Sequence, residues 1–284
     1  DKILTDWNGL MIAALAKAAR AFDDPEYLAA AEKAAAFVLE SLRGPDGRLL
    51  HRYRGGEAGL PATLDDYAFM LWALIEVYEA SFAPRYLKTA TELSRDLIAR
   101  YWDCTHGGFF FTPDDGDVPV RQKPLYDGAV PSGNSVAMYA LFVLGRMTAN
   151  LELEETANRM RQVFADTVRG SPTAFAHFLT GLEFMLGPNF EVIVTGVAGA
   201  GDTTAMVRAL RSHYAPDALT IFRPSGEENP EIVEVAGFTR DIVMVEEKAT
   251  AYVCTNYACD IPTTDIDEML QLLGSKERPP EPIV

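Results

Sequence analysis

Two kinds of helical pattern alternate between residues 5 and 186. Three segments, residues 9–22, 64–80 and 136–145, are apolar on nearly every side of the helix. A helix of this kind is expected to be enclosed by protein. The segments between them carry one apolar stripe, which is typical of a helix with one face in solvent. The stripes consist of Tyr27, Ala31, Ala34 and Val38; of Tyr86, Ala90, Leu93 and Leu97; and of Leu153, Ala157, Met160 and Phe164.

The enclosed and striped helices repeat as a pair. Pro25 and Tyr27 open one striped helix, and Pro84 and Tyr86 open the next. Proline suits the first turn of a helix because its missing N–H is not needed there. The repeat predicts a mainly α fold in which an inner ring of helices is wrapped by an outer ring, as in a toroid.

Long loops are expected to gather on one rim of this toroid. Residues 44–62 and 103–131 are long connections, and each leads into the start of an enclosed helix. Their glycine-containing parts, residues 44–51 and 107–112, suggest short β-hairpins. Long loops often carry function, so we expect the active rim where the inner helices begin.

The pattern changes after Leu186. A strand is expected at residues 190–195, a helix at 203–214 and a strand at 218–222, followed by a strand at 251–254 and a helix at 264–273. Strand, helix and strand in this order indicate a small α/β appendage with at least one parallel pair. We therefore predict a toroid part at 1–187, an appendage at 188–275 and a disordered tail at 276–284.

Charge and hydropathy exclude several classes of protein. The chain has 25 Lys and Arg against 41 Asp and Glu, a formal net charge of -16. Such acidity disfavours nucleic acid as a partner. No apolar run has the length of a membrane helix, and no signal peptide is evident, so we expect a cytoplasmic protein without a membrane partner.

Neither the cysteines nor the glycines form a recognised cofactor motif. Cys104, Cys254 and Cys259 are too few and odd in number for a disulfide framework. The last two are spaced C-x4-C, which matches neither a dithiol redox site nor a zinc ribbon, so we expect structural thiols. The glycines at residues 196–201 resemble a phosphate-binding turn but lack the dinucleotide order and a P-loop lysine. We expect neither a metal nor a cofactor.

Three short polar groups open the enclosed helices. They supply the expected catalytic residues, Asp65, Asp66 and Asp127, and the expected substrate-binding residues Trp7, Asn8, Tyr67, Ser132 and Asn134. In a toroid these groups meet at the mouth of the central cavity. Carboxylates, amides and aromatic rings over a bowl suit a sugar, and paired carboxylates supply an acid and a base.

Helix capping is the main alternative for these groups. Thr5, Thr63 and Ser132 stand at N-cap positions, and acidic residues favour helix N-termini in any case. Asp127 favours the functional interpretation, because it precedes its helix by too many residues to cap it.

Four further side chains are candidates for binding the substrate. Trp72 and Glu76 share a helix face with Asp65 and would lie deeper in the bowl, although a buried Trp with a paired Glu is more often a packing feature. His51 and His106 lie on the long loops as candidate acids or bases. No close histidine pair with metal-ligand spacing occurs.

The polar groups belong to a longer set of motifs. These are residues 1–11, Asp65-Asp66-Tyr67-Ala68, residues 127–135 and residues 249–262, which include the C-x4-C stretch. In this order they resemble the thioredoxin-domain-containing family of spermatogenesis-associated proteins and their bacterial relatives. The resemblance implies a thioredoxin-like domain followed by an (α/α)6 toroid, similar to six-hairpin glycosidases and N-acylglucosamine 2-epimerases. This chain has too few hairpins for a closed ring, so we expect a C-terminal portion with an incomplete toroid.

The leading hypothesis for function is therefore a toroid that binds or processes a carbohydrate, as an isomerase, epimerase or glycosidase would. The alternative is a non-enzymatic scaffold that presents or recognises a partner for an attached thioredoxin-like domain. A third hypothesis, nucleotide binding at residues 196–203, has only the glycine turn in its favour.

Overall fold

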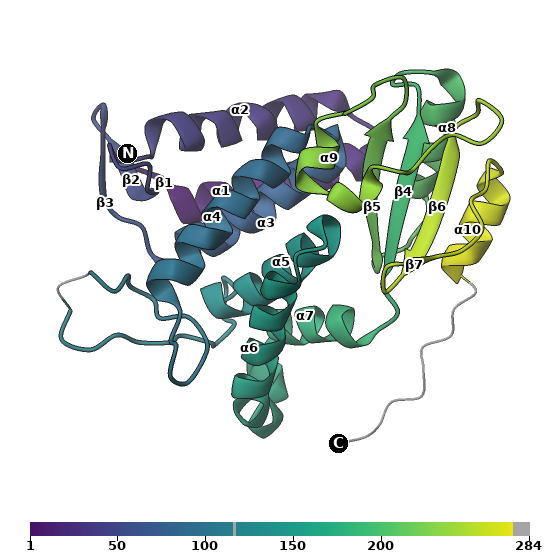
Figure 1. Cartoon of the computed structure of the whole chain (residues 1–284). Coiled ribbons are helices and arrows are strands. Elements are labelled where there is room, and N and C mark those ends of the chain that lie inside the picture. Colours follow the sequence, from purple (N-terminus) through teal and green to yellow (C-terminus); the bar gives the residue numbers. More distant parts are fainter. Residues whose placement is uncertain (116–117, 275–284) are drawn as a thin grey trace. The chain divides into compact units, whose positions relative to one another are not determined.

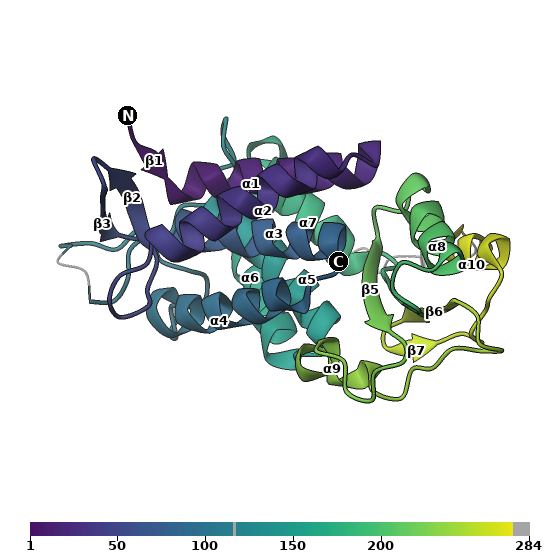
Figure 2. The same cartoon turned by 90° about the horizontal axis from the view of Figure 1, so that it is seen from above.

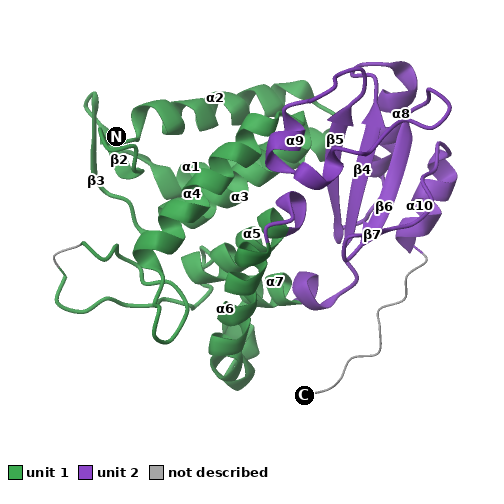
Figure 3. Cartoon of the chain, in the orientation of Figure 1, with its two compact units in different colours: residues 1–145, 151–182 green, residues 146–150, 183–284 purple. Residues whose placement is uncertain are grey.

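The computed structural model describes residues 1–115 and 118–274 (Figure 1). The chain is mainly α and forms two compact units, residues 1–145 with 151–182, and residues 146–150 with 183–284 (Figure 3). The sequence had placed this boundary at residue 187. The expected tail at 276–284 and residue 275 of the expected appendage lie outside the described residues.

Seven long helices begin within the described residues of the first unit. They are α1 (Thr5–Phe22), α2 (Pro25–Ser41), α3 (Leu64–Ser81), α4 (Pro84–Tyr101), α5 (Gly133–Thr148), α6 (Leu151–Gly170) and α7 (Ala176–Leu186), with a 3-10 turn, η1 (Pro172–Ala174), before α7. Helix α1 packs against α2 and α3, and α3 also packs against α4 (Figure 2). Gly9 permits the close contact of α1 with α3, because a Cβ there would lie 2.8 Å from the Phe69 backbone.

The predicted alternation is confirmed for most helices. All but three residues of α3 are buried. The predicted stripes of α4 and α6 are buried in full, while the polar faces of both helices are exposed. In α2 the stripe is displaced, since Ala35 rather than Ala34 is fully buried and Tyr27 is exposed.

The prediction that α1 is enclosed was wrong. Its residues that face α2 and α3, such as Ile12 and Ala16, are fully buried. In contrast, Trp7, Met11 and Phe22 are 65%, 59% and 71% exposed. Apolar character around a helix shows that burial would be favourable, but neighbouring helices decide which sides are covered.

The first long loop forms a hairpin at a different place from the one expected. Strands β1 (Ile3–Leu4), β2 (Leu50–Arg54) and β3 (Glu57–Pro61) form an antiparallel sheet. The hairpin turn is Gly55-Gly56, where both residues have positive φ, as the tight turns of hairpins require. Residues 44–47 form a turn closed by an isolated antiparallel bridge between Arg43 and Leu49, and in the described part of the second loop a similar bridge joins Trp102 and Phe109.

The second unit is built on a four-stranded sheet in the order β5-β4-β6-β7. Its elements are β4 (Phe190–Gly196), α8 (Gly201–Ser212), β5 (Ala218–Pro224), α9 (Ile232–Val235), η2 (Gly237–Thr239), β6 (Thr250–Thr255), β7 (Ala258–Cys259) and α10 (Ile266–Gly274). The predicted parallel pair, β4 with β5, is confirmed, and β6 runs antiparallel to β4. Met206 of α8 and Met269 of α10 share one core cluster with Val192 and Val253, so both helices cover the same face.

The prediction of structural thiols at Cys254 and Cys259 was wrong. The two residues lie directly opposite each other in the β6–β7 hairpin and form a disulfide. Cys104 is a free, exposed cysteine. The spacing alone did not reveal the pairing, because it depends on the two-residue turn between the strands.

No helix in the described part of the chain combines the length and apolar character needed to cross a membrane.

Candidate functional site

A pocket of about 510 Å³ opens in the first unit. Leu10, Ala14 and Lys17 line one side, because their spacing places them on one face of α1. Trp72 of α3, Asp127 of the loop before α5 and His177 of α7 complete the part of the wall that can make specific contacts. Two residues proposed from the sequence, Trp72 and Asp127, therefore meet in one cavity.

Trp72 is held in a fixed orientation at the pocket wall. Its indole Nε1 donates a hydrogen bond of 2.9 Å to Glu76 Oε1. Glu76 is only 2% exposed and also forms ion pairs with Lys17, at 2.7 Å, and with Arg20. Glu76 thus lies behind Trp72 and is not itself part of the pocket lining. Its role in this geometry is to position Trp72 and Lys17.

His177 lies beside the indole and was not among the residues chosen from the sequence. Its ring centroid is 5.2 Å from that of Trp72. Its buried Nε2 has no hydrogen-bond partner within the described residues. Burial lowers the pKa of His177, so the imidazole is neutral near pH 7 and is able to accept a proton. In the sequence, the one signal that singles out His177 is its position at the start of a helix.

Asp127 caps a helix other than the one that follows it in the chain. Its Oδ2 accepts hydrogen bonds from the backbone N–H groups of His177, at 2.9 Å, and Phe178, at 3.0 Å. Its Oδ1 accepts a hydrogen bond of 2.8 Å from the N–H of Ser132. From the sequence, capping was excluded only for the helix that follows Asp127, whereas the helix that Asp127 caps is α7, which lies far along the chain. Its catalytic role stays a prediction. Asp127 fixes His177 within the pocket.

Four titratable residues, Asp6, His51, Asp65 and Asp66, form a second group that we call the rim cluster. Asp66 is fully buried and accepts hydrogen bonds from the N–H of Thr63 at 2.7 Å and from the N–H of Asp6 at 2.9 Å. His51 Nδ1 lies 3.0 Å from both Asp66 oxygens. This confirms that the first long loop meets the start of an inner helix. It also shows that Asp66 serves as the carboxylate of a capping box.

Burial and nearby negative charge raise the pKa of two carboxylates of the rim cluster, Asp65 and Asp6. Burial and the nearby charges of Asp6 and Asp66 raise the pKa of Asp65 to about 6. Burial and Asp66 also raise the pKa of Asp6. The hydrogen bond to Asp66 raises the pKa of His51. A group that titrates near pH 6 suits proton transfer. Repulsion among carboxylates with a purely structural role also raises their pKa, so the shift alone does not identify a catalytic group.

The rim cluster has the composition of a possible metal site. One ligand atom from each of Asp6, His51 and Asp66 lies within 4.8 Å of the others. Both Asp66 oxygens, however, already accept hydrogen bonds, including those from Thr63 and His51. A cation would have to displace these donors, so the geometry fits a hydrogen-bonded cluster better than a metal centre.

Asp65→Asn is expected to stabilise the protein at neutral pH. Because the native pKa of Asp65 is raised, the folded state holds its proton more tightly than the unfolded state does. The stability of the wild type should therefore fall as the pH rises from about 4 to about 6. Urea denaturation at pH 4 and pH 7.5 should show a gain of about 1–2 kcal/mol for the variant at the higher pH only. An equal effect at both pH values would contradict the raised pKa.

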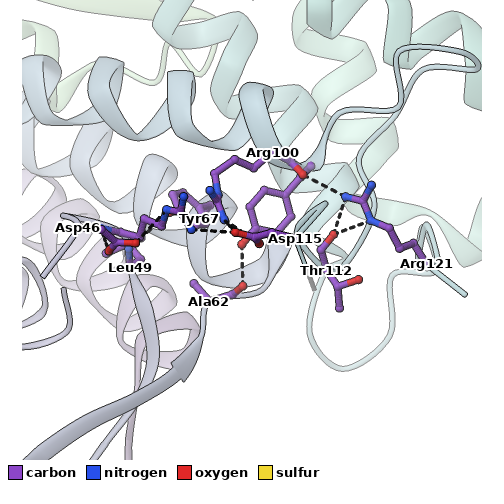
Figure 4. A network of polar contacts seen from close by, with 10 residues as sticks. Asp46, Leu49, Ala62, Tyr67, Arg100, Thr112, Asp115 and Arg121 are labelled. Carbon is purple, nitrogen blue, oxygen red and sulfur yellow. Dashed lines mark hydrogen bonds and ion pairs between the residues drawn. The ribbon is translucent and has the colours of Figure 1, made fainter. Parts of the chain in front are cut away.

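Three of the expected binding residues are buried in structural roles. Tyr67 is 1% exposed, packs against Tyr101 and accepts a hydrogen bond from the N–H of Leu49 (Figure 4), so it offers no face to a ligand. Asn134, fully buried, donates to the backbone oxygens of Phe109 and Pro124 and accepts from the Phe109 N–H. Ser132 caps α5 through Ser135. The expectation that Tyr67 binds the substrate does not fit this burial.

The other expected residues do not line the pocket. Trp7 is exposed on α1, and Asn8 donates to the Leu4 carbonyl oxygen. His106, with a side chain 77% exposed, pairs with Asp103 on the second long loop. That loop is anchored by Arg121, which donates to the backbone oxygens of Thr112 and Arg100 (Figure 4).

The glycine turn before α8 is poorly suited to phosphate. Asp202 stands in the first turn of α8, and its carboxylate accepts hydrogen bonds from the N–H groups of Thr203 and Ala249. This negative charge occupies the helix N-terminus that a phosphate would need. The hypothesis of nucleotide binding loses its physical basis.

The chain is similar to proteins of known sequence over nearly all its length. No family model matches it. Spermatogenesis-associated protein 20 from Homo sapiens is 29% identical over 96% of this chain and 36% of that protein. The uncharacterised protein B0495.5 from Caenorhabditis elegans is 28% identical over 96% of this chain and 38% of that protein. The chain thus spans little more than a third of these relatives.

A solved structure shares the fold. A GH76 α-mannanase from Bacteroides thetaiotaomicron has a TM-score of 0.53 and 14% identity, covering 84% of this chain and 70% of the enzyme. At this identity the likeness concerns the fold alone. The resemblance predicted from the motifs is confirmed: the chain is similar to spermatogenesis-associated protein 20 and has a fold of the (α/α)6 class.

Proposed function

We propose that the pocket of the first unit binds a carbohydrate and that His177 transfers a proton to or from it. The observation that carries this proposal is the juxtaposition of a fixed indole and a pocket-lining histidine, whose buried Nε2 has no hydrogen-bond partner among the described residues. A sugar offers an apolar face to an indole and hydroxyl groups to an imidazole and an ammonium group. Trp72, His177 and Lys17 supply these three contacts.

The protonation state of His177 indicates the class of reaction. A neutral imidazole near pH 7 acts as a general base and returns the proton as a general acid, which suits isomerisation, epimerisation or glycoside hydrolysis. Asp127 and Asp66, which the sequence suggested as catalytic, are engaged by backbone donors and act in this scheme by positioning other groups. That an α-mannanase shares the fold supports a carbohydrate as the ligand class.

Tryptophan fluorescence tests the binding step. Titration with neutral hexoses, hexosamines and uronic acids is expected to change the emission of Trp72 for at least one class. Trp72→Ala should weaken that binding by about tenfold or more, because the stacking surface is lost. Trp102→Phe is the matched control, since Trp102 packs against Phe109 and does not line the pocket. Absence of any response to all three classes would reject the proposal.

Proton transfer is tested separately in deuterated water. For a bound sugar, nuclear magnetic resonance should show exchange of a carbon-bound proton, or release of a reducing end from an oligosaccharide. His177→Asn should abolish this turnover while leaving most of the binding. Unchanged turnover in this variant would show that His177 lines the pocket but does not transfer the proton.

A further inference from the structure

The β6–β7 hairpin of the second unit ends in a short, disulfide-closed loop. Cys254 pairs with Cys259 and Thr255 pairs with Ala258, so two residue pairs hold the hairpin. The turn residues Asn256 and Tyr257 both have positive φ, at 52° and 63°. Such backbone is unfavourable for residues other than glycine. The hairpin therefore depends on contacts beyond its own backbone.

The two sulfur-bearing residues differ in exposure. Cys254 lies in β6 and is 2% exposed, whereas Cys259 is exposed in β7, the edge strand of the sheet. Thiol–disulfide exchange requires a thiolate to reach one sulfur in line with the bond that breaks. The geometry directs that attack to Cys259 and makes Cys254 the leaving group.

The turn of the hairpin contacts a buried ion pair within the same unit. Arg146 Nε donates to Glu191 Oε1 at 2.8 Å, and these side chains are 5% and 1% exposed. The Arg146 guanidinium lies 4.3 Å from the centroid of the Tyr257 ring. The Tyr257 N–H also donates to Glu191 Oε2 at 3.4 Å. Tyr257 thus covers the ion pair, and the disulfide closes the loop that carries Tyr257.

We propose that the Cys254–Cys259 disulfide is a site of thiol–disulfide exchange with a dithiol reductant, and that its reduction releases Tyr257 from Arg146 and Glu191. The exchange proceeds at the sulfur of the exposed residue, Cys259. The loop then loses its covalent closure, and the two-pair hairpin no longer holds its strained turn.

The exchange balances with a dithiol as the co-reactant. One thiolate of the reductant attacks Cys259 Sγ, forming a mixed disulfide and breaking the Cys254–Cys259 bond. The electron pair stays on Cys254 Sγ, which takes a proton from solvent. The second thiolate of the reductant then displaces Cys259, which is protonated in turn. The protein gains two electrons and two protons, and the reductant becomes a disulfide.

Alkylation of the folded, full chain tests the exchange. Intact mass spectrometry before reduction should show one alkylated cysteine, Cys104, which is free and exposed. Brief treatment with dithiothreitol without denaturant should raise the number to three. Reduction only after unfolding in guanidinium would overturn the proposal, as would three free thiols before any reductant is added.

Two variants in a Cys104→Ser background test the direction of attack. Cys259 in Cys254→Ser should react with an aromatic disulfide reagent at least about tenfold faster than Cys254 in Cys259→Ser, because only the former is exposed. Equal rates would contradict the assigned direction. Hydrogen exchange on the reduced wild type should accelerate at residues 255–258 and stay unchanged in β4. No change at the turn would show that the disulfide does not hold Tyr257.

Discussion

Replacing Glu191 with alanine is expected to lower the free energy of unfolding of the second unit by about 3–5 kcal/mol. Glu191 is 1% exposed and pairs with the guanidinium of Arg146, which is 4% exposed. The variant would leave a buried positive charge without its carboxylate. Removing a buried partner of this charge is costly because the protein interior solvates a charge poorly. Urea denaturation followed by circular dichroism measures the loss.

A double variant separates the charge from the volume it occupies. Arg146→Met with Glu191→Leu removes both charges and keeps apolar bulk, so its stability should lie within about 1 kcal/mol of the wild type or above it. Arg146→Met alone should be strongly destabilising, as Glu191→Ala is. If both single variants were as stable as the wild type, the ion pair would not contribute to stability. The contact of Tyr257 with the ion pair would then have no structural role.

Replacing Asp66 with alanine is expected to cost about 2–4 kcal/mol of stability. The fully buried carboxylate accepts hydrogen bonds from the N–H groups of Thr63 and Asp6, and it orients His51. The variant would leave these donors unpaired and would release the start of α1 and the β2 strand from α3. Thermal and urea denaturation at pH 7.5 measure the effect.

The adjacent carboxylate provides the matched control. Asp65→Asn is expected to stabilise the protein at pH 7.5, so neighbouring substitutions should act in opposite directions. A stable Asp66→Ala protein that had lost activity would instead support the catalytic role that the sequence suggested. The pair of variants therefore distinguishes a structural carboxylate from a reacting one.

Periodicity alone was enough to identify most of the helices and the strands β4, β5 and β6 of the second unit. The stripes of α4 and α6 and the parallel pair of β4 and β5 were all anticipated, because local burial patterns report directly on which faces meet protein. The exposure of Trp7 and Met11 was not anticipated. Their apolar character indicates that burial would be favourable. Whether another helix packs over them depends on the tertiary structure.

The candidate site shows the same division. Residue type and helix spacing placed Trp72 and Glu76 on one face of α3, and the structure has them in contact. Asp127 and His177 are far apart in the chain, so no local pattern could show that one caps the helix of the other. That Nε2 of His177 has no hydrogen-bond partner within the described residues is equally invisible in the sequence, because it depends on the contacts of every neighbouring element.

The sequence by itself determined the alternation of helices, the α/β character of the second unit and the polar groups at the helix starts, since each depends on residues close together in the chain. Only the tertiary structure decided which carboxylates are caps, which histidine enters the pocket and which cysteines pair. Those outcomes depend on distances between segments that the chain brings together by folding, and local spacing carries no record of them.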